Sequence, residues 1–155
     1  MPLKFGSTTV ANVEYVDMEQ VFMIRLDKII YNGTTVFERQ KTLTTITENV
    51  EYAYYYTSSS SGASFRYPAA SLQLSNTPVK VTKIVSNLPG GGSSTISSSG
   101  LSGSMSAYIS TGKSSSYTSV PWSVSGSKLN ITAAGSSSGS TKSTIKISIT
   151  YQYYA

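Results

Sequence analysis

Apolar and polar residues alternate most regularly at the C-terminal end of the chain. Between residues 144 and 154, isoleucine or tyrosine occupies every second position, and the positions between them are mainly polar. Successive side chains of a β-strand point to opposite faces, whereas a helix would distribute these apolar residues around its axis. The pattern predicts an amphipathic strand over residues 144–154, with its isoleucine and tyrosine face toward a core.

Shorter alternations of the same kind recur upstream, separated by clusters of Ser, Gly, Asn and Pro that are typical of turns. They lie at residues 50–56, 65–67, 72–74, 79–81, 105–109, 120–124 and 129–133. With the last strand they make roughly eight short strands, at the spacing found in β-sandwiches and jelly rolls. No segment after residue 42 has a helical period. The prediction is an all-β chain with an antiparallel β-sandwich or jelly-roll-like domain over residues 42–155.

The N-terminal part has a different composition and its own hairpin signal. Residues 1–41 contain five of the seven acidic residues and a single serine, Ser7, whereas residues 42–155 are rich in Ser, Thr, Gly and Tyr. Within residues 29–37, Asn32-Gly33 is a preferred pair for a two-residue type I′ turn, which needs positive φ at both positions. Residues 17–30 fit a helix or a strand. The sequence therefore predicts a small β-hairpin module over residues 1–41.

The residue inventory argues against an enzyme. The chain has no histidine and no cysteine, so it lacks the commonest general base, the thiolate nucleophile and the usual zinc ligands. No Asp or Glu follows Glu51 in the sequence. Paired-carboxylate hydrolysis and calcium sites therefore have no residues to use after that point. We expect no catalytic residues, no metal and no cofactor.

Charge and hydropathy restrict the partners. Residues 1–51 carry five basic and seven acidic side chains, and residues 52–155 carry seven basic and none acidic. Nucleic-acid binders concentrate Lys and Arg on one face or arm, but these seven are scattered, so we expect no nucleic acid as a partner. No apolar run is long enough for a membrane span. The first residues do not form a secretory signal, and synthesis without a signal peptide, in the cytoplasm, is expected.

Aromatic residues supply the candidate contact groups. Trp122 alternates with Val120 and Val124, which favours a place in the core. Four tyrosines fall outside the apolar faces and are candidates for exposed contacts: Tyr55, Tyr108, Tyr117 and Tyr154. Flat aromatic faces of this kind can pack against sugar rings. A carbohydrate-binding module is therefore an alternative to a purely structural role.

Residues 4–10 and 28–38 carry a resemblance to a known group of proteins. The segments Lys4-Phe-Gly-Ser-Thr-Thr-Val10 and Lys28-Ile-Ile-Tyr-Asn-Gly-Thr-Thr-Val-Phe-Glu38 resemble a motif of structural proteins of tailed phages and of prophages of Gram-positive bacteria. In that motif an FGxTxV opening leads into a VYxNGTxVW hairpin. Here a longer insert separates the two pieces, and Phe37 stands where the family commonly has Trp.

The resemblance implies a function and a location. A chain of this group is a structural component of a virion, in the tail, the neck or the capsid decoration, and contacts other virion proteins and copies of itself. Its N-terminal module would dock through turn residues that here are Phe5, Gly6, Asn32 and Gly33. The alternative within the same group is a carbohydrate- or receptor-binding domain of a fibre or tail tip that contacts a glycan of the host surface.

Overall fold

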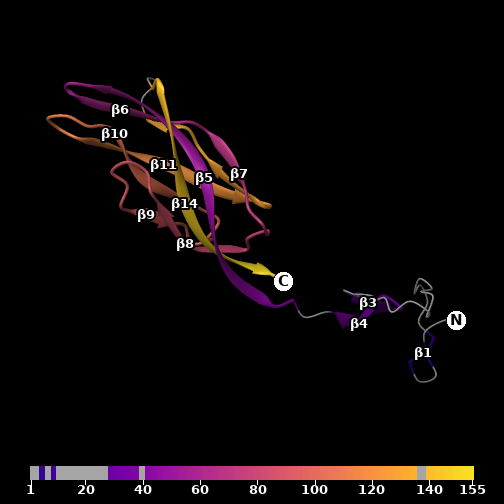
Figure 1. Ribbon diagram of the computed structural model, residues 1–155. Coiled ribbons are helices and arrows are strands. Elements are labelled where there is room, and N and C mark those ends of the chain that lie inside the picture. Colours follow the sequence, from indigo (N-terminus) through magenta and orange to yellow (C-terminus); the bar gives the residue numbers. More distant parts are fainter. Residues whose placement is uncertain (1–3, 6–7, 10–27, 39–40, 136–138) are drawn as a thin grey trace. The chain divides into compact units, whose positions relative to one another are not determined.

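The computed structural model describes residues 4–5, 8–9, 28–38, 41–135 and 139–155, and every regular element among them is a β-strand (Figure 1). The predicted all-β class is therefore confirmed. The chain divides into two compact units, Met1–Lys41 and Thr42–Ala155. Each unit has its own strand pairing.

The first unit contains the hairpin at Asn32-Gly33. Strands β3 (Lys28–Tyr31) and β4 (Thr34–Glu38) pair antiparallel on either side of this turn. Asn32 has a φ of 47° and Gly33 a φ of 75°, and a type I′ turn requires positive values at both positions. Residues 28–30 are thus strand.

The remaining expectations for the first unit fall mostly outside the described residues. Strand β1 (Lys4–Phe5) pairs antiparallel with β2 (Thr8–Thr9), which places Phe5 in a short strand. Gly6 lies outside the described residues, as does most of the segment over 17–30 that fits either helix or strand. The docking role of Phe5, Gly6, Asn32 and Gly33 therefore stays a prediction.

Replacing Gly33 by valine should destabilise the hairpin by about 1–2 kcal/mol, because a β-branched residue resists positive φ. A Cβ at this position would meet no atom within 4 Å, so the whole effect comes from the backbone. Amide exchange of residues 28–38 in the full chain measures it. Gly33→Asn is the matched control, because asparagine tolerates this conformation. Equal protection in Gly33→Val and the parent would contradict the turn assignment.

The second unit is one ten-stranded antiparallel sheet. Its main path runs in the order β7-β12-β11-β10-β6-β5-β14-β8, while β9 pairs with β10 and β13 pairs with β6. The strands are β5 (Leu43–Ser59), β6 (Gly62–Tyr67), β7 (Ala70–Gln73), β8 (Lys80–Ser86), β9 (Ser94–Ile96), β10 (Ser102–Ser110), β11 (Ser116–Ser125), β12 (Lys128–Ile131), β13 (Ala134–Gly135) and β14 (Thr141–Tyr154).

The sheet bends so that its two halves enclose a common core. Strands β6 and β10 share only the pair Ser64 and Ser110, and this narrow link joins the half with β5, β14 and β8 to the half with β7, β12 and β11. Figure 1 shows β5 and β14 crossing over β10 and β11, and buried side chains of both halves form one cluster. Because the pairing joins all ten strands, the two separate sheets of a sandwich stay a prediction.

The two longest strands form the centre of one half. Strand β14 pairs with β5 from Thr141 opposite Tyr56 to Tyr154 opposite Leu43. Ile147, Ile149 and Tyr151 are completely buried, which confirms the amphipathic strand predicted for residues 144–154. The structure extends that strand back to Thr141, because its polar start is paired along β5.

Candidate ligand-binding surface

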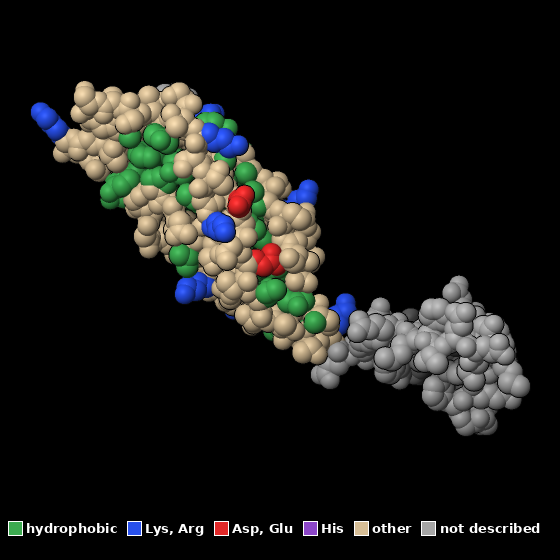
Figure 2. Space-filling view, viewed as in Figure 1, with side chains coloured by type: hydrophobic (Ala, Val, Ile, Leu, Met, Phe, Trp, Pro, Cys, Tyr) green, Lys and Arg blue, Asp and Glu red, His purple; other side chains and the backbone are tan. Residues whose placement is uncertain are grey.

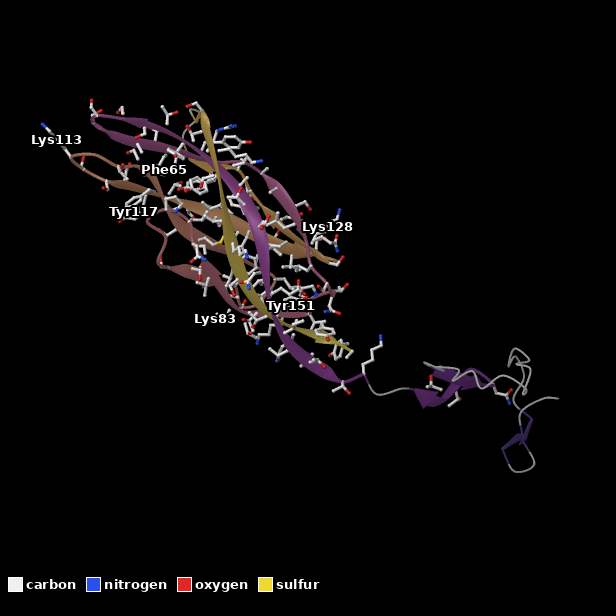
Figure 3. The ribbon with its side chains drawn as sticks, viewed as in Figure 1. Phe65, Lys83, Lys113, Tyr117, Lys128 and Tyr151 are labelled. Atoms are coloured by element: carbon white, nitrogen blue, oxygen red, sulfur yellow. The ribbon has the colours of Figure 1, made fainter. Side chains whose placement is uncertain are left out.

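Aromatic side chains from four strands lie in continuous contact at the end of the sheet where β6 meets β10. Neighbouring ring centroids are 4.7 to 6.4 Å apart, within the range of favourable aromatic pairs. Figure 2 shows a hydrophobic area on the visible face where Figure 3 labels Phe65 and Tyr117. We call the following residues the aromatic cluster: Tyr54, Tyr56, Phe65, Tyr67, Tyr108 and Tyr117.

One end of the aromatic cluster is anchored in the core. Tyr67 is completely buried, and its hydroxyl donates a 2.6 Å hydrogen bond to the backbone carbonyl of Tyr108. Tyr52, on the adjacent strand, likewise donates to the carbonyl of Pro68 at 2.7 Å. A buried phenol needs such an acceptor, because an unpaired hydroxyl in the core is costly. The bond from Tyr67 ties β6 to β10 and holds the Tyr108 backbone in place.

These buried tyrosines predict a loss of stability at high pH. Burial raises the pKa of Tyr52, Tyr67 and Tyr151 above the ordinary value, and for Tyr151 a hydrogen bond with Glu48 adds to this effect. The folded state therefore keeps protons that the unfolded chain releases near about pH 10. The stabilisation is fully present below that pH and is lost as the pH rises above it.

Urea denaturation at about pH 8 and about pH 11 measures this effect. The midpoint should be lower at the higher pH. The Tyr52→Phe variant serves as the control, because it lacks one of the buried phenols and undergoes the same change of pH. Its midpoint should fall less than that of the parent between the two conditions. An equal fall in both would contradict the role of the buried phenol.

The other end of the aromatic cluster is open to solvent. Tyr117 is 56% exposed and lies directly opposite Tyr108 in the β10–β11 pair, with ring centroids 4.7 Å apart. The nearby Tyr108 phenol is the main cause that raises the pKa of Tyr117. Gly90 contacts the Tyr108 ring so closely that a Cβ there would lie 2.3 Å from it. Tyr108 is thus held by its neighbours, while Tyr117 remains accessible.

A surface groove of about 240 Å³ begins at Tyr117. It lies on the outer face of β9, β10 and β11, where the register places Thr95 opposite Ser104 and Ser106 opposite Ser119. All of its lining residues carry a hydroxyl group and none carries a charge: Ser93, Thr95, Ser104, Ser106, Tyr117, Thr118 and Ser119. Serine side chains are short, which leaves the face hollow beside the larger tyrosine.

Part of the hydroxyl set is already ordered. The Thr95 and Ser104 hydroxyl oxygens are 2.9 Å apart, and the Ser104 backbone N–H donates to the Thr95 hydroxyl at 3.1 Å. The Ser93 and Ser106 hydroxyls make no hydrogen bond to another described residue, so their donors and acceptors can serve a ligand or water. The groove can therefore bind a neutral molecule that has hydroxyl groups and a flat apolar face.

The four tyrosines predicted as exposed contacts have different surroundings. Tyr117 and Tyr154 are 56% and 55% exposed, whereas Tyr55 and Tyr108 are half-buried. Tyr55 is partly covered because the Arg66 guanidinium lies 4.6 Å from the centre of its ring. The structure brings Tyr108 and Tyr117 together, and Tyr55 and Tyr154 make no ring contact with this pair among the described residues.

Sequence reasoning missed the serine and threonine residues of the groove and the contact of Phe65 with Tyr108. A signal for the tyrosine pair did exist, because Tyr108 and Tyr117 lie on either side of the Gly112–Ser116 turn cluster and a hairpin centred there pairs them. Trp122 is only 2% exposed. Its predicted place in the core is confirmed, so it does not contribute to the surface.

In the part of the chain that the structure describes, all regular elements are strands. No helix in that part of the chain has the length and hydropathy to cross a membrane. The same part contains no group of three or more Asp, Glu, His or Cys side chains arranged to hold a metal ion.

Comparison with protein-family models, with curated proteins and with solved structures gives no match.

Proposed function

We propose that the chain is a non-enzymatic structural component of a phage virion, in the tail, the neck or the capsid decoration. Residues 1–41 attach it to other virion proteins, and Thr42–Ala155 is the displayed β domain. The observation that carries this proposal is the division into two compact units. The division falls where a segment with five of the seven acidic residues and a single serine gives way to one rich in Ser, Thr, Gly and Tyr.

The second unit has the features of a domain that folds alone. All described residues of the buried cluster belong to this unit, and its ends are joined by a 3.0 Å hydrogen bond from the Ala155 N–H to the Thr42 carbonyl. A unit of about 40 residues without disulfides or metal is near the lower limit for an independent core. The first unit therefore needs a partner surface. The resemblance of its hairpin to virion proteins indicates that another virion protein supplies this surface.

Deletion of residues 1–41 tests this division of labour. The remaining chain should stay β-rich by circular dichroism, because its core is intact. When it is added to particles that lack this protein, the fragment should no longer co-sediment with them. The full chain is the control and should co-sediment. An unfolded fragment would show that the first unit completes the domain. A folded fragment that still binds particles would move the attachment surface to the β domain.

A second candidate function is a carbohydrate- or receptor-binding β domain. The observation that favours it is the exposed ring of Tyr117 beside a groove lined only by hydroxyl-bearing residues. The two functions are compatible, because a displayed domain of a virion can also contact a glycan of the host surface. Attachment would then belong to the first unit and recognition to the second.

A further inference from the structure

We propose that the groove beside Tyr117 binds a neutral oligosaccharide, with one sugar ring stacked on the face of Tyr117 and its neighbours hydrogen-bonded along the serine and threonine floor. This inference rests on the second candidate function and identifies its site and ligand class. It does not depend on attachment to a virion. Its support comes from the aromatic platform, the arrangement of the hydroxyl groups and the absence of charge from the groove lining.

The aromatic platform is rigid. A sugar ring has a face of C–H groups that packs against a flat aromatic surface, and tyrosine offers such a surface at a low cost in side-chain entropy. The Tyr117 ring is tilted by 36° against Tyr108 at 4.7 Å. Tyr108 is itself fixed by its contact with Gly90 and by the bond from Tyr67 to its carbonyl. The exposed ring therefore rests on a neighbour that cannot easily move.

The hydroxyl groups extend the site along the strands. Ser104, Ser106 and Tyr108 occupy alternate positions of β10, so their side chains share the outer face. Ser104 and Tyr108 are four positions apart along the strand, a distance of roughly 13–14 Å at the usual rise per residue. That length suits a short oligosaccharide. Each hydroxyl can donate one hydrogen bond and accept two, which matches the alternating donors and acceptors of a sugar.

The ligand should be uncharged. The groove lining has no Lys, Arg, Asp or Glu, so a charged ligand would lose hydration there without gaining a counter-charge. Figure 3 places the labelled lysines, Lys83, Lys113 and Lys128, apart from Tyr117. None of the seven basic residues of 52–155 lines the groove.

Titration of the full chain by two-dimensional amide NMR tests the proposal. The probes are maltotetraose, cellotetraose and chitotetraose as neutral oligosaccharides and a hyaluronan tetrasaccharide as an anionic one. At least one neutral probe should shift amide signals of β9, β10 and β11 near Tyr117, and the anionic probe should leave them unchanged. The proposal is overturned if all three neutral probes leave these amide signals unchanged, or if the shifted signals belong to residues elsewhere on the sheet.

Substitutions then identify the platform. Tyr117→Ala should weaken binding of the responding probe about tenfold, equivalent to about 1.4 kcal/mol, and Tyr117→Phe should retain most of it. Tyr154→Ala is the matched control, because Tyr154 is 55% exposed but lies outside the groove. The affinity of this variant for the probe should equal that of the parent. The double variant Ser106→Ala/Ser119→Ala keeps the ring and should also bind more weakly. Parental affinity in both Tyr117→Ala and the serine variant would overturn the proposal.

Discussion

Replacing Trp122 by alanine is expected to destabilise the β domain by about 3–5 kcal/mol. Trp122 is the largest of the buried side chains and is 2% exposed. It lies at the centre of β11, where it faces the cluster to which both halves of the sheet contribute. Loss of the indole would leave a cavity that backbone pairing on both sides keeps from closing. Urea denaturation of the full chain followed by far-ultraviolet circular dichroism measures the change.

Trp122→Phe is the control for this prediction. The indole Nε1 of Trp122 is buried and has no hydrogen-bond partner among the described residues, and an unpaired buried N–H is itself unfavourable. Phenylalanine removes that group while keeping most of the apolar volume. The Phe variant should therefore be clearly more stable than the Ala variant. If Trp122→Ala unfolds at the same urea concentration as the parent, the residue does not hold the two halves together.

The second large effect is expected at Gly103, the second residue of β10. A Cβ at this position would lie 1.9 Å from the Thr95 carbonyl oxygen and 2.8 Å from Cζ2 of Trp122. The oxygen belongs to the backbone of β9, which cannot yield without breaking its pairing with β10. Gly103→Ala should therefore cost about 3 kcal/mol, the upper part of the usual range for overpacking. The same denaturation experiment measures it.

Gly92→Ala is the matched control for Gly103→Ala. A Cβ on Gly92 would meet no atom within 4 Å, so its stability should stay within about 0.5 kcal/mol of the parent. Gly103→Ala should also impair the groove, because displacement of β9 moves Thr95 away from Ser104. Parental stability in Gly103→Ala would mean that β9 is not packed against β10 at this point.

The proposed site depends on the same contact. Thr95 and Ser93 reach the groove only because β9 and the residue before it lie against β10. Gly103 allows this close approach, and Trp122 lies beneath it. Stability of the core and shape of the hydroxyl-lined surface are therefore coupled at one place. A variant that loosens this contact should lose oligosaccharide binding before it unfolds completely.

The sequence alone determined the strand class and several local features. Alternation with a period of two showed which residues of 144–154 face the core, and the Val120-Trp122-Val124 alternation placed the indole inside. Asn32-Gly33 identified the hairpin turn, because few other residue pairs tolerate positive φ at both positions. These inferences succeed because each depends on residues a few positions apart, whose side-chain directions the backbone period fixes.

Only the tertiary structure decided which strands pair and what gathers on the outer faces. Strands β5 and β14 lie far apart in the sequence but share the longest ladder, and an alternation pattern cannot select a partner or a register. Strand β9 was missed because its Ser94–Ile96 segment is mostly polar and is held by its approach to Gly103. Likewise, Tyr55 and Tyr117 look alike in the sequence. Arg66 covers one and Tyr108 supports the other, because exposure depends on neighbours supplied by other strands.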